Sequence, residues 1–336
     1  MRYEDLFVAG YGTWLPPAMS AAECVHRGLC EDRIVAATAM SAVTVSEDLS
    51  GPELAVRAGR RALVHSGLGA ADVDLLTFSA LYYHGHDMWA PASYVHRETV
   101  GGSCPAVEVR QTSNGGMAAL DLAAAYLTVS ANRQTALLTC GDRFCPPGFD
   151  RWRSDPGTVF ADGGAALVLS RHGGFARLRS LVVGGDSELE GMHRGDDPFG
   201  PAPLSLRTPI DVHHTTRAFL RSAGASYALT RMATGQAQVV KLALAEADTD
   251  LPAIDWYVLP NFGRRRMESN FFRPLGVDPD RTAWDWGRGV GHLGAGDQFA
   301  GLAHLLDSGR LRPGQRCAMI GVGGGFSWSC AVLEMV

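Results

Sequence analysis

The residues best suited to chemistry lie in the stretch VEVRQTSNGGMAALDLAAAYL, from Val107 to Leu127. Thr112, Ser113 and Asn114 follow a short strand-like run and precede a helix-forming segment that is apolar or small on almost every side. A helix of that kind is normally enclosed by protein, so its first turn is expected to lie deep. A serine hydroxyl there would meet unpaired backbone N–H groups and the positive end of the helix dipole.

Two interpretations of this serine are open. Ser113 or Asn114 could be an ordinary helix N-cap, a role worth about 1 kcal/mol of stability. Alternatively, Ser113 is a nucleophile, with Gly115 and Gly116 letting a substrate approach and backbone N–H groups binding an oxyanion. The second interpretation requires a general base, because a serine hydroxyl does not ionise on its own.

His292 is the candidate base, since imidazole titrates near neutrality. It lies in GRGVGHLGAGDQFAGL, a glycine-rich turn that leads into a second helix-forming segment. Asp297 follows shortly after and could orient the imidazole, which predicts a triad of Ser113, His292 and Asp297. The alternative for Asp297 is an ordinary acidic residue in the first turn of a helix.

Two parts of the chain repeat the order helix, strand, helix, strand. The first copy is expected at 53–67, 73–83, 115–129 and 135–140, and the second at 236–247, 254–260, 296–306 and 316–323. This repeat predicts an α/β fold of two pseudo-symmetric halves, which we place at residues 1–175 and 176–336. The first half would carry the Ser113 elbow and the second half the His292 and Asp297 site. Residues 184–216 have no periodicity and predict a loop or cap beside a functional opening.

Composition excludes several classes of function. The 336 residues are 46% hydrophobic and carry a net charge of −5 without a basic stripe, so no nucleic-acid partner is expected. No run approaches the ~20 apolar residues of a membrane span. Seven cysteines without metal-ligand spacing indicate a reducing cytoplasm and no metal site. The cluster Arg264–Arg266 is either a solvated loop or a docking point for a phosphorylated cofactor arm or an acidic carrier protein.

Four separated motifs, in matching order, resemble the ketoacyl-acyl-carrier-protein synthase III family of the thiolase superfamily. They are the opening GYGTWLPP, the TSNG elbow, FADGGAALVL at residues 160–169, and GVGGGFSWSCAVLEM near the C-terminus. The resemblance implies a thiolase-like five-layered αβαβα fold and a homodimer. It also implies that acyl-coenzyme A or an acyl carrier protein delivers a thioester on phosphopantetheine, with no permanently bound cofactor.

Three positions depart from this family. The family has a nucleophilic cysteine where Ser113 stands, a histidine where Asn261 stands and an asparagine where His292 stands. That histidine and asparagine jointly stabilise the oxyanion of a decarboxylative condensation. In this chain the histidine and asparagine positions are exchanged, and a serine replaces the cysteine. A serine needs general-base help that a thiolate scarcely needs, so these departures favour acyl transfer over decarboxylative condensation.

The resemblance assigns further expected roles. The backbone N–H groups of Ser113 or of the Gly323–Gly325 loop would bind the oxyanion, with Gly324 and Asn261 as candidates. His193 is either an extra proton carrier or a surface-loop histidine. The remaining expected substrate contacts are Thr112, Asn114 and Phe326.

We therefore expect an acyltransferase that moves a short or aromatic acyl group through Ser113 to a carrier protein or a natural-product hydroxyl, in polyketide or antibiotic biosynthesis. One alternative is a starter-unit ketosynthase that condenses with malonyl carrier protein, Asn261 and His292 sharing the decarboxylation. Another is a non-catalytic partner subunit of a synthase.

Overall fold

The computed structural model describes residues 1–336, and the first part of the chain contributes five strands to the main sheet. These are β1 (Phe7–Trp14), β4 (Leu75–Ser79), β5 (Ala106–Val109), β6 (Thr135–Asp142) and β7 (Gly163–Ser170). They lie in the order β5-β4-β6-β7-β1. Strand β7 is antiparallel to both of its neighbours, whereas β4 is parallel to β5 and β6. Every residue of β6 and β7 is buried, which explains the apolar segments at 136–138 and 165–169.

The second part of the chain repeats this arrangement with four strands. These are β8 (Ala176–Gly185), β9 (Trp256–Val258), β10 (Arg316–Gly323) and β11 (Ser327–Met335), in the order β8-β11-β10-β9. Strand β11 is antiparallel to β8 and β10, and β10 is parallel to β9. A short pairing of β1 with β8 joins both parts into one nine-stranded sheet. The common strand order is the signature of two pseudo-symmetric halves.

Twelve α-helices accompany the strands, and a separate two-stranded sheet pairs β2 (Ala18–Ser20) with β3 (Ala42–Thr44). The helices are α1 (Ala21–His26), α2 (Asp32–Thr38), α3 (Gly51–Ser66), α4 (Pro91–Thr99), α5 (Gly115–Thr128), α6 (Gly191–Arg194), α7 (Val212–Ala223), α8 (Ala225–Glu246), α9 (Arg264–Met267), α10 (Arg273–Leu275), α11 (Trp284–Gly287) and α12 (Asp297–Asp307). None of them combines the length and apolarity that a membrane span requires.

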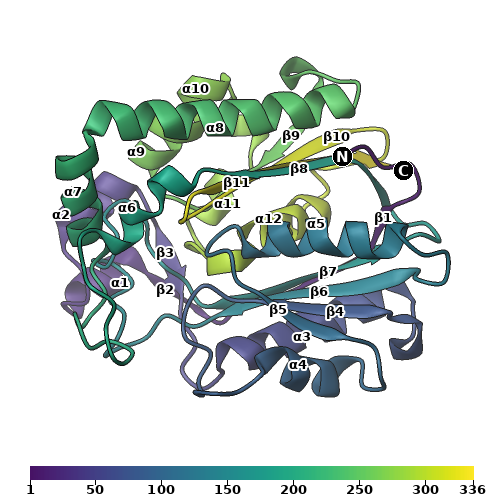
Figure 1. The fold of residues 1–336 in the computed structure, drawn as a ribbon, viewed down its shortest axis with the longest axis horizontal. Coiled ribbons are helices and arrows are strands. Elements are labelled where there is room, and N and C mark those ends of the chain that lie inside the picture. Colours follow the sequence, from purple (N-terminus) through teal and green to yellow (C-terminus); the bar gives the residue numbers. More distant parts are fainter.

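The elements form five layers (Figure 1). From bottom to top these are α3 with α4, the first part of the sheet, α5 with α12, the second part of the sheet, and α8. The main hydrophobic core lies in the middle, where Met117 and Leu120 of α5 and Phe299 of α12 pack between the strands. The expected five-layered αβαβα fold is therefore confirmed. The expected division at residue 175 falls between β7 and β8 and stays a prediction.

The expected cap is more ordered than its composition suggested. Strand β8 continues to Gly185, α6 occupies Gly191–Arg194, and α7 begins at Val212, so that residues 195–211 are the longest stretch without helix or strand. The start of α7 is fixed by Asp211, whose carboxylate accepts a hydrogen bond from the backbone N–H of His214. In Figure 1 this cap lies on the left, beside the turn between β10 and β11.

Candidate active site

Ser113 stands on a tight elbow between β5 and α5. Asn114 N donates to Gln111 O (3.1 Å) and Gly115 N donates to Thr112 O (3.0 Å), which closes the turn. Thr112 has a φ of 47°, in the left-handed region that a β-branched residue rarely adopts. Its hydroxyl donates to Gly324 O at 3.1 Å, so the loop between β10 and β11 holds the elbow in place.

The side chain of Ser113 contacts the imidazole of His292. Ser113 Oγ lies 2.8 Å from His292 Nε2. His292 is held from its own backbone, because its N–H donates to Val159 O and its carbonyl accepts from Ala161 N, both at 2.8 Å. The imidazole is buried while Ser113 is half-buried, so the hydroxyl is the more accessible partner.

Asp297, the first residue of α12, contacts the other nitrogen of the same ring. His292 Nδ1 lies 2.5 Å from Asp297 Oδ2. The carboxylate also accepts from Leu293 N (2.8 Å), Asn261 N (2.8 Å) and Asn261 Nδ2 (3.3 Å). Because a carboxylate oxygen only accepts, Nδ1 carries the proton and Nε2 presents its lone pair to Ser113. The structure thus brings together the three residues expected to form a triad.

Neither N-cap interpretation describes the elbow. Asn114 occupies the N-cap position, but its side chain makes no capping bond, and Ser113 Oγ is directed to His292. Asn114 is 0% exposed, its amide donates to Gln111 Oε1 and its carbonyl accepts from Ser329 Oγ. The expectation that Asn114 contacts substrate is therefore wrong, because both polar ends are bonded inside the core.

Asn261 also differs from its expected role. It is 3% exposed, and its side-chain amide donates to Gly291 O (3.0 Å) and Asp297 Oδ1 (3.3 Å). Both N–H bonds of the amide are therefore committed within the protein. Asn261 positions Asp297 and has no donor left for an oxyanion.

The loop from Gly323 to Gly325 lies against the elbow. A Cβ added to Gly323 would lie 2.6 Å from Thr112 Oγ1, which shows how closely the two segments approach. The N–H groups of Ser113 and Gly324 donate to no protein acceptor, so both are free to receive an oxyanion. The expected oxyanion role of Ser113 N and Gly324 N stays a prediction.

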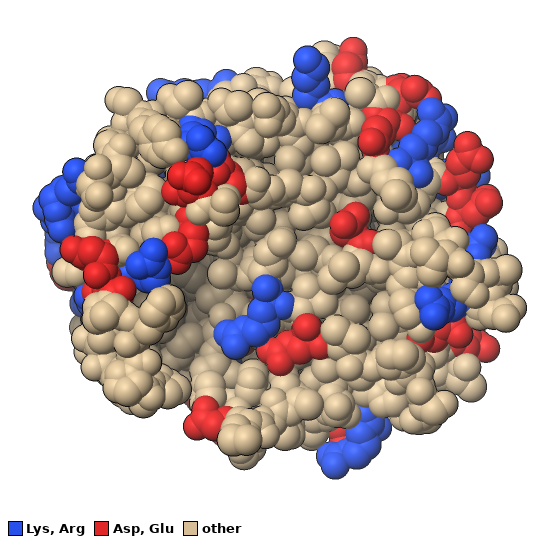
Figure 2. All heavy atoms as spheres, in the orientation of Figure 1, with Lys and Arg blue, Asp and Glu red and all other residues tan.

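His193 and Phe326 form one wall beside that loop. Their rings stack with centroids 5.7 Å apart, and the imidazole lies directly over Gly324. His193 keeps an exposed surface, but desolvation by the neighbouring protein lowers the pKa of its imidazole, while the nearby Asp155 carboxylate opposes that shift. No hydrogen bond joins His193 to Ser113 or His292. Figure 2 shows a hollow between the cap and the layered body.

Several groups around the triad escaped the sequence analysis. The rings of Phe160 and Phe262 flank the imidazole of His292, each with its centroid 5.2 Å from the imidazole centroid. Asp142 is buried at the end of β6 and accepts from the N–H groups of Leu81, Tyr82 and Ala295, while desolvation raises its pKa. The sequence pattern that could have pointed to Asp142 is an acidic residue at the end of a buried strand.

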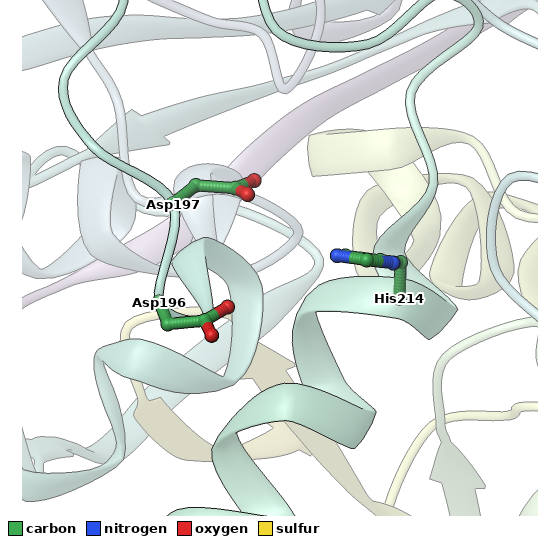
Figure 3. A group of neighbouring side chains, drawn as sticks. All are labelled: Asp196, Asp197 and His214. Atoms are coloured by element: carbon green, nitrogen blue, oxygen red, sulfur yellow. The ribbon is translucent and has the colours of Figure 1, made fainter.

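One cluster of side chains on the cap contains residue types that can bind a metal. Asp196, Asp197 and His214 offer atoms that lie within 4.8 Å of one another (Figure 3). However, Asp197 already forms two hydrogen bonds with Arg207, at 2.7 and 3.1 Å. We assign this group no metal, since the carboxylate of Asp197 is neutralised by Arg207.

Comparison with known proteins identifies the family. A model described as the C-terminal part of 3-oxoacyl-[acyl-carrier-protein] synthase III matches residues 244–335. The solved structure of ChlB3, described as an acyltransferase, is 34% identical with a TM-score of 0.95 and covers 99% of this chain and 98% of its own. The chain belongs to the ketoacyl synthase III-like family of the thiolase superfamily.

Curated relatives in this family are synthases. The β-ketoacyl-[acyl-carrier-protein] synthase III of Rhodospirillum rubrum is 27% identical over 84% of each chain. That of Paramagnetospirillum magneticum is 28% identical over 84% of this chain and 83% of its own. The corresponding structure from Aquifex aeolicus shares the fold, with 15% identity, a TM-score of 0.79 and coverage of 98% and 99%. These relatives confirm the resemblance and support a transferase enzyme.

Proposed function

We propose that the protein is an acyltransferase that carries an acyl group on Ser113. The observation that carries this proposal is the continuous contact from Ser113 Oγ to His292 Nε2 (2.8 Å) and from His292 Nδ1 to Asp297 Oδ2 (2.5 Å). Such a chain supplies the base that a hydroxyl nucleophile requires. The likeness to ChlB3 supports the same class of reaction.

In the first step, Ser113 Oγ attacks the carbonyl carbon of an acyl thioester and His292 Nε2 takes the hydroxyl proton. The N–H groups of Ser113 and Gly324 stabilise the resulting oxyanion. The C–S bond then breaks, the thiol leaves with the proton from His292, and an ester remains on Ser113. In the second step the acceptor thiol or hydroxyl gives its proton to His292 and attacks the carbonyl carbon of this ester. The bond between that carbon and Ser113 Oγ breaks, and His292 returns the proton to Ser113 Oγ.

The donor is acyl-coenzyme A or an acyl carrier protein, and phosphopantetheine is part of the substrate rather than a resident cofactor. A hollow of about 290 Å³ lined by Arg264, Arg265, Glu268, Ser269 and Arg273 is our candidate docking point for phosphate or an acidic carrier protein. Arg264 and Arg273 both form ion pairs with Glu268 there, which leaves Arg265 as the more available cation. The acceptor is a carrier-protein thiol or a natural-product hydroxyl of a polyketide or antibiotic pathway.

The test is the detection of the acyl-enzyme by intact-protein mass spectrometry after incubation with short acyl-coenzyme A. The native chain should gain one acyl mass, and Ser113→Ala should gain none. Ser222→Ala, which removes an exposed serine on α7, is the matched control and should label normally. Undiminished labelling of Ser113→Ala would place the nucleophile elsewhere and refute the mechanism.

A second candidate function is starter-unit condensation, which the curated synthase relatives favour. Acyl-coenzyme A supplied together with malonyl carrier protein separates the two reactions. Acyl transfer predicts acyl carrier protein as product, whereas condensation predicts a ketoacyl carrier protein and release of carbon dioxide. A protein that reacts with no thioester, yet binds another synthase stably, would instead be a non-catalytic subunit.

A further inference from the structure

Arg266 makes contacts that set it apart from the two arginines that precede it in the chain. It does not line the hollow that they border, and its guanidinium contacts the loop between β6 and β7 instead. Nη1 and Nη2 donate to the two carboxylate oxygens of Asp155 at 2.6 and 3.0 Å. Nη2 also donates to Pro156 O at 2.7 Å, and Nη1 donates to Thr158 Oγ1. One guanidinium therefore fastens the turn from Asp155 to Thr158 to α9.

The ion pair of Arg266 with Asp155 is charged although protein covers most of it. The two side chains are 29% and 15% exposed. Burial raises the pKa of the Asp155 carboxyl, but the Arg266 guanidinium outweighs burial and holds that pKa below its ordinary 3.8. Removing two charges from water offsets much of the energy of their attraction, so such a pair is weak evidence for stability. Its two parallel N–H···O bonds, however, fix the position of the turn closely.

The segment that follows this turn holds the backbone of His292. His292 N donates to Val159 O, and Ala161 N donates to His292 O, both at 2.8 Å. Val159 directly follows Thr158, which is 1% exposed and bonded to the guanidinium. A displacement of the turn would therefore reach the backbone of the candidate base through a single peptide bond.

A second set of contacts leads from Arg266 to the imidazole through the ring of Phe262. The guanidinium carbon Cζ lies 5.4 Å from the centroid of this ring, within reach of a cation–π contact. The same centroid lies 5.2 Å from that of the His292 imidazole. Phe262 is 7% exposed, and Trp284 Nε1 donates to its carbonyl oxygen at 2.9 Å. Arg266 is thus linked to His292 both through the loop and through an aromatic ring.

We propose that Arg266, held by Asp155, is a positioning residue for the imidazole of His292. This inference rests on the acyl transfer proposed above. His292 Nε2 takes the proton of Ser113 Oγ across a contact of 2.8 Å, and a misplacement near 1 Å lowers the rate of a positioned reaction by about 100-fold. Arg266 therefore affects the rate of the chemical step, whereas the docking role proposed for Arg265 affects binding of the donor.

The experiment measures the single-turnover rate constant of acyl-enzyme formation across a range of concentrations of short acyl-coenzyme A. Arg266→Gln should lower this rate constant by about 10-fold to 100-fold and leave the concentration for half-maximal rate unchanged. Arg266→Lys keeps the charge but not the planar fork, so it should recover part of the loss. A first-order rate constant does not depend on the amount of folded protein.

A double variant and a second readout complete the test. Because Arg266→Gln leaves the Asp155 carboxylate unpaired, Asp155→Asn combined with Arg266→Gln is measured as well, and it should show the same loss without an unpaired charge. Amide hydrogen exchange does not depend on acyl transfer. Exchange of the backbone N–H groups of Ala161 and His292 should be about 10-fold faster in both variants than in the native chain.

Arg207→Gln is the matched control. Arg207 donates to both carboxylate oxygens of Asp197, and these side chains are 26% and 19% exposed, but the pair lies on the cap. An equal response to the Arg207 and Arg266 changes, or an unchanged rate constant in Arg266→Gln, would overturn the positioning role. A raised half-maximal concentration with an unchanged rate constant would make Arg266 a docking residue instead. A native chain that forms no acyl-enzyme, with the expected changes in exchange, would refute acyl transfer and uphold the positioning of His292.

Discussion

Asn261 shows how the partners of a residue decide its role. Its backbone N–H and its side-chain amide both donate to the carboxylate of Asp297, and the amide also donates to Gly291 O. Asp297 in turn contacts Nδ1 of His292. Asn261 therefore acts on the candidate base through a second residue, as a positioning residue rather than a substrate contact.

Asn261→Ala should slow acyl-enzyme formation by about 10-fold to 100-fold, because a hydrogen bond to a charged group is lost in a buried site. The backbone bond to Asp297 remains, so the loss should be smaller than that of Ser113→Ala. Single-turnover kinetics would measure the effect, which should appear in the rate constant and leave the acyl-coenzyme A concentration for half-maximal rate unchanged. Asn270→Ala serves as control, and an unaltered rate for Asn261→Ala would remove Asn261 from the site.

At the scale of elements, the distance between α5 and the turn before α12 sets the geometry of the site. A Cβ on Gly116 would lie 2.5 Å from Ala295 O and 2.9 Å from Cys140 Sγ. Both contacts are closer than packed side chains allow. The start of α5 can therefore approach the turn that follows His292 only because position 116 has no side chain.

Gly116→Ala should force α5 away from that turn and lengthen the contact between Ser113 and His292. We expect acyl-enzyme formation to fall by about 100-fold, since a misplacement near 1 Å has that effect on a positioned reaction. Gly59→Ala in α3 is the control, because its added Cβ would meet mainly methyl groups at 3.1 and 3.4 Å. Comparable rates in the two variants would show that this close approach is not required.

The start of α3 gives a pH-dependent prediction. The backbone N–H and the hydroxyl of Ser50 donate to Glu53 at 2.8 and 2.7 Å, and these bonds lower the Glu53 pKa from its ordinary 4.5. A lowered carboxyl pKa stabilises the fold fully above the ordinary value, and the contribution is lost as pH falls through the folded value. Glu53→Gln should cost about 1 kcal/mol at pH 7 in urea unfolding. A difference in unfolding free energy between the native chain and Glu53→Gln that persists undiminished at pH ~3 would contradict the capping role.

At the scale of the whole molecule, one edge of the sheet is left uncovered. Strand β5 pairs only with β4, and its Val107 is 45% exposed. Leu122 and Val129, at the outer side and end of α5, are 54% and 73% exposed. An unpaired strand edge with apolar side chains is prone to pair with another chain. We propose that a second copy of this chain covers it, as the family resemblance implies.

Val107→Lys should convert the dimer to monomer at micromolar concentration, because a charge on the strand would be buried in the interface. Sedimentation velocity measures the change directly. Thr128→Lys, on the same helix as Leu122, tests whether the effect is specific to the strand. A native chain that sediments as a monomer at every accessible concentration would refute the proposed dimer.

The sequence allowed the layers and the contact of Ser113 with His292 to be anticipated. Both residues precede buried helices, and the repeated order of elements places those helix starts at the centre. The partners of Asn114 and Asn261 could not be anticipated, because Ser329 and Asp297 are distant in sequence and their bonds depend on the packed fold. Phe160 and Phe149 likewise resemble any core residue until their contacts are known.

Ser113 and His292 come from the two different repeated parts of the chain, and this has a consequence for protein engineering. Ser113 comes from the part of the chain before β8, and His292 and Asp297 come from the part after it, so neither part alone supplies the whole candidate triad. Fragments cut between β7 and β8 should be inert when separate and regain turnover only after reassociating, which would make the chain a candidate for a two-piece reporter of protein proximity.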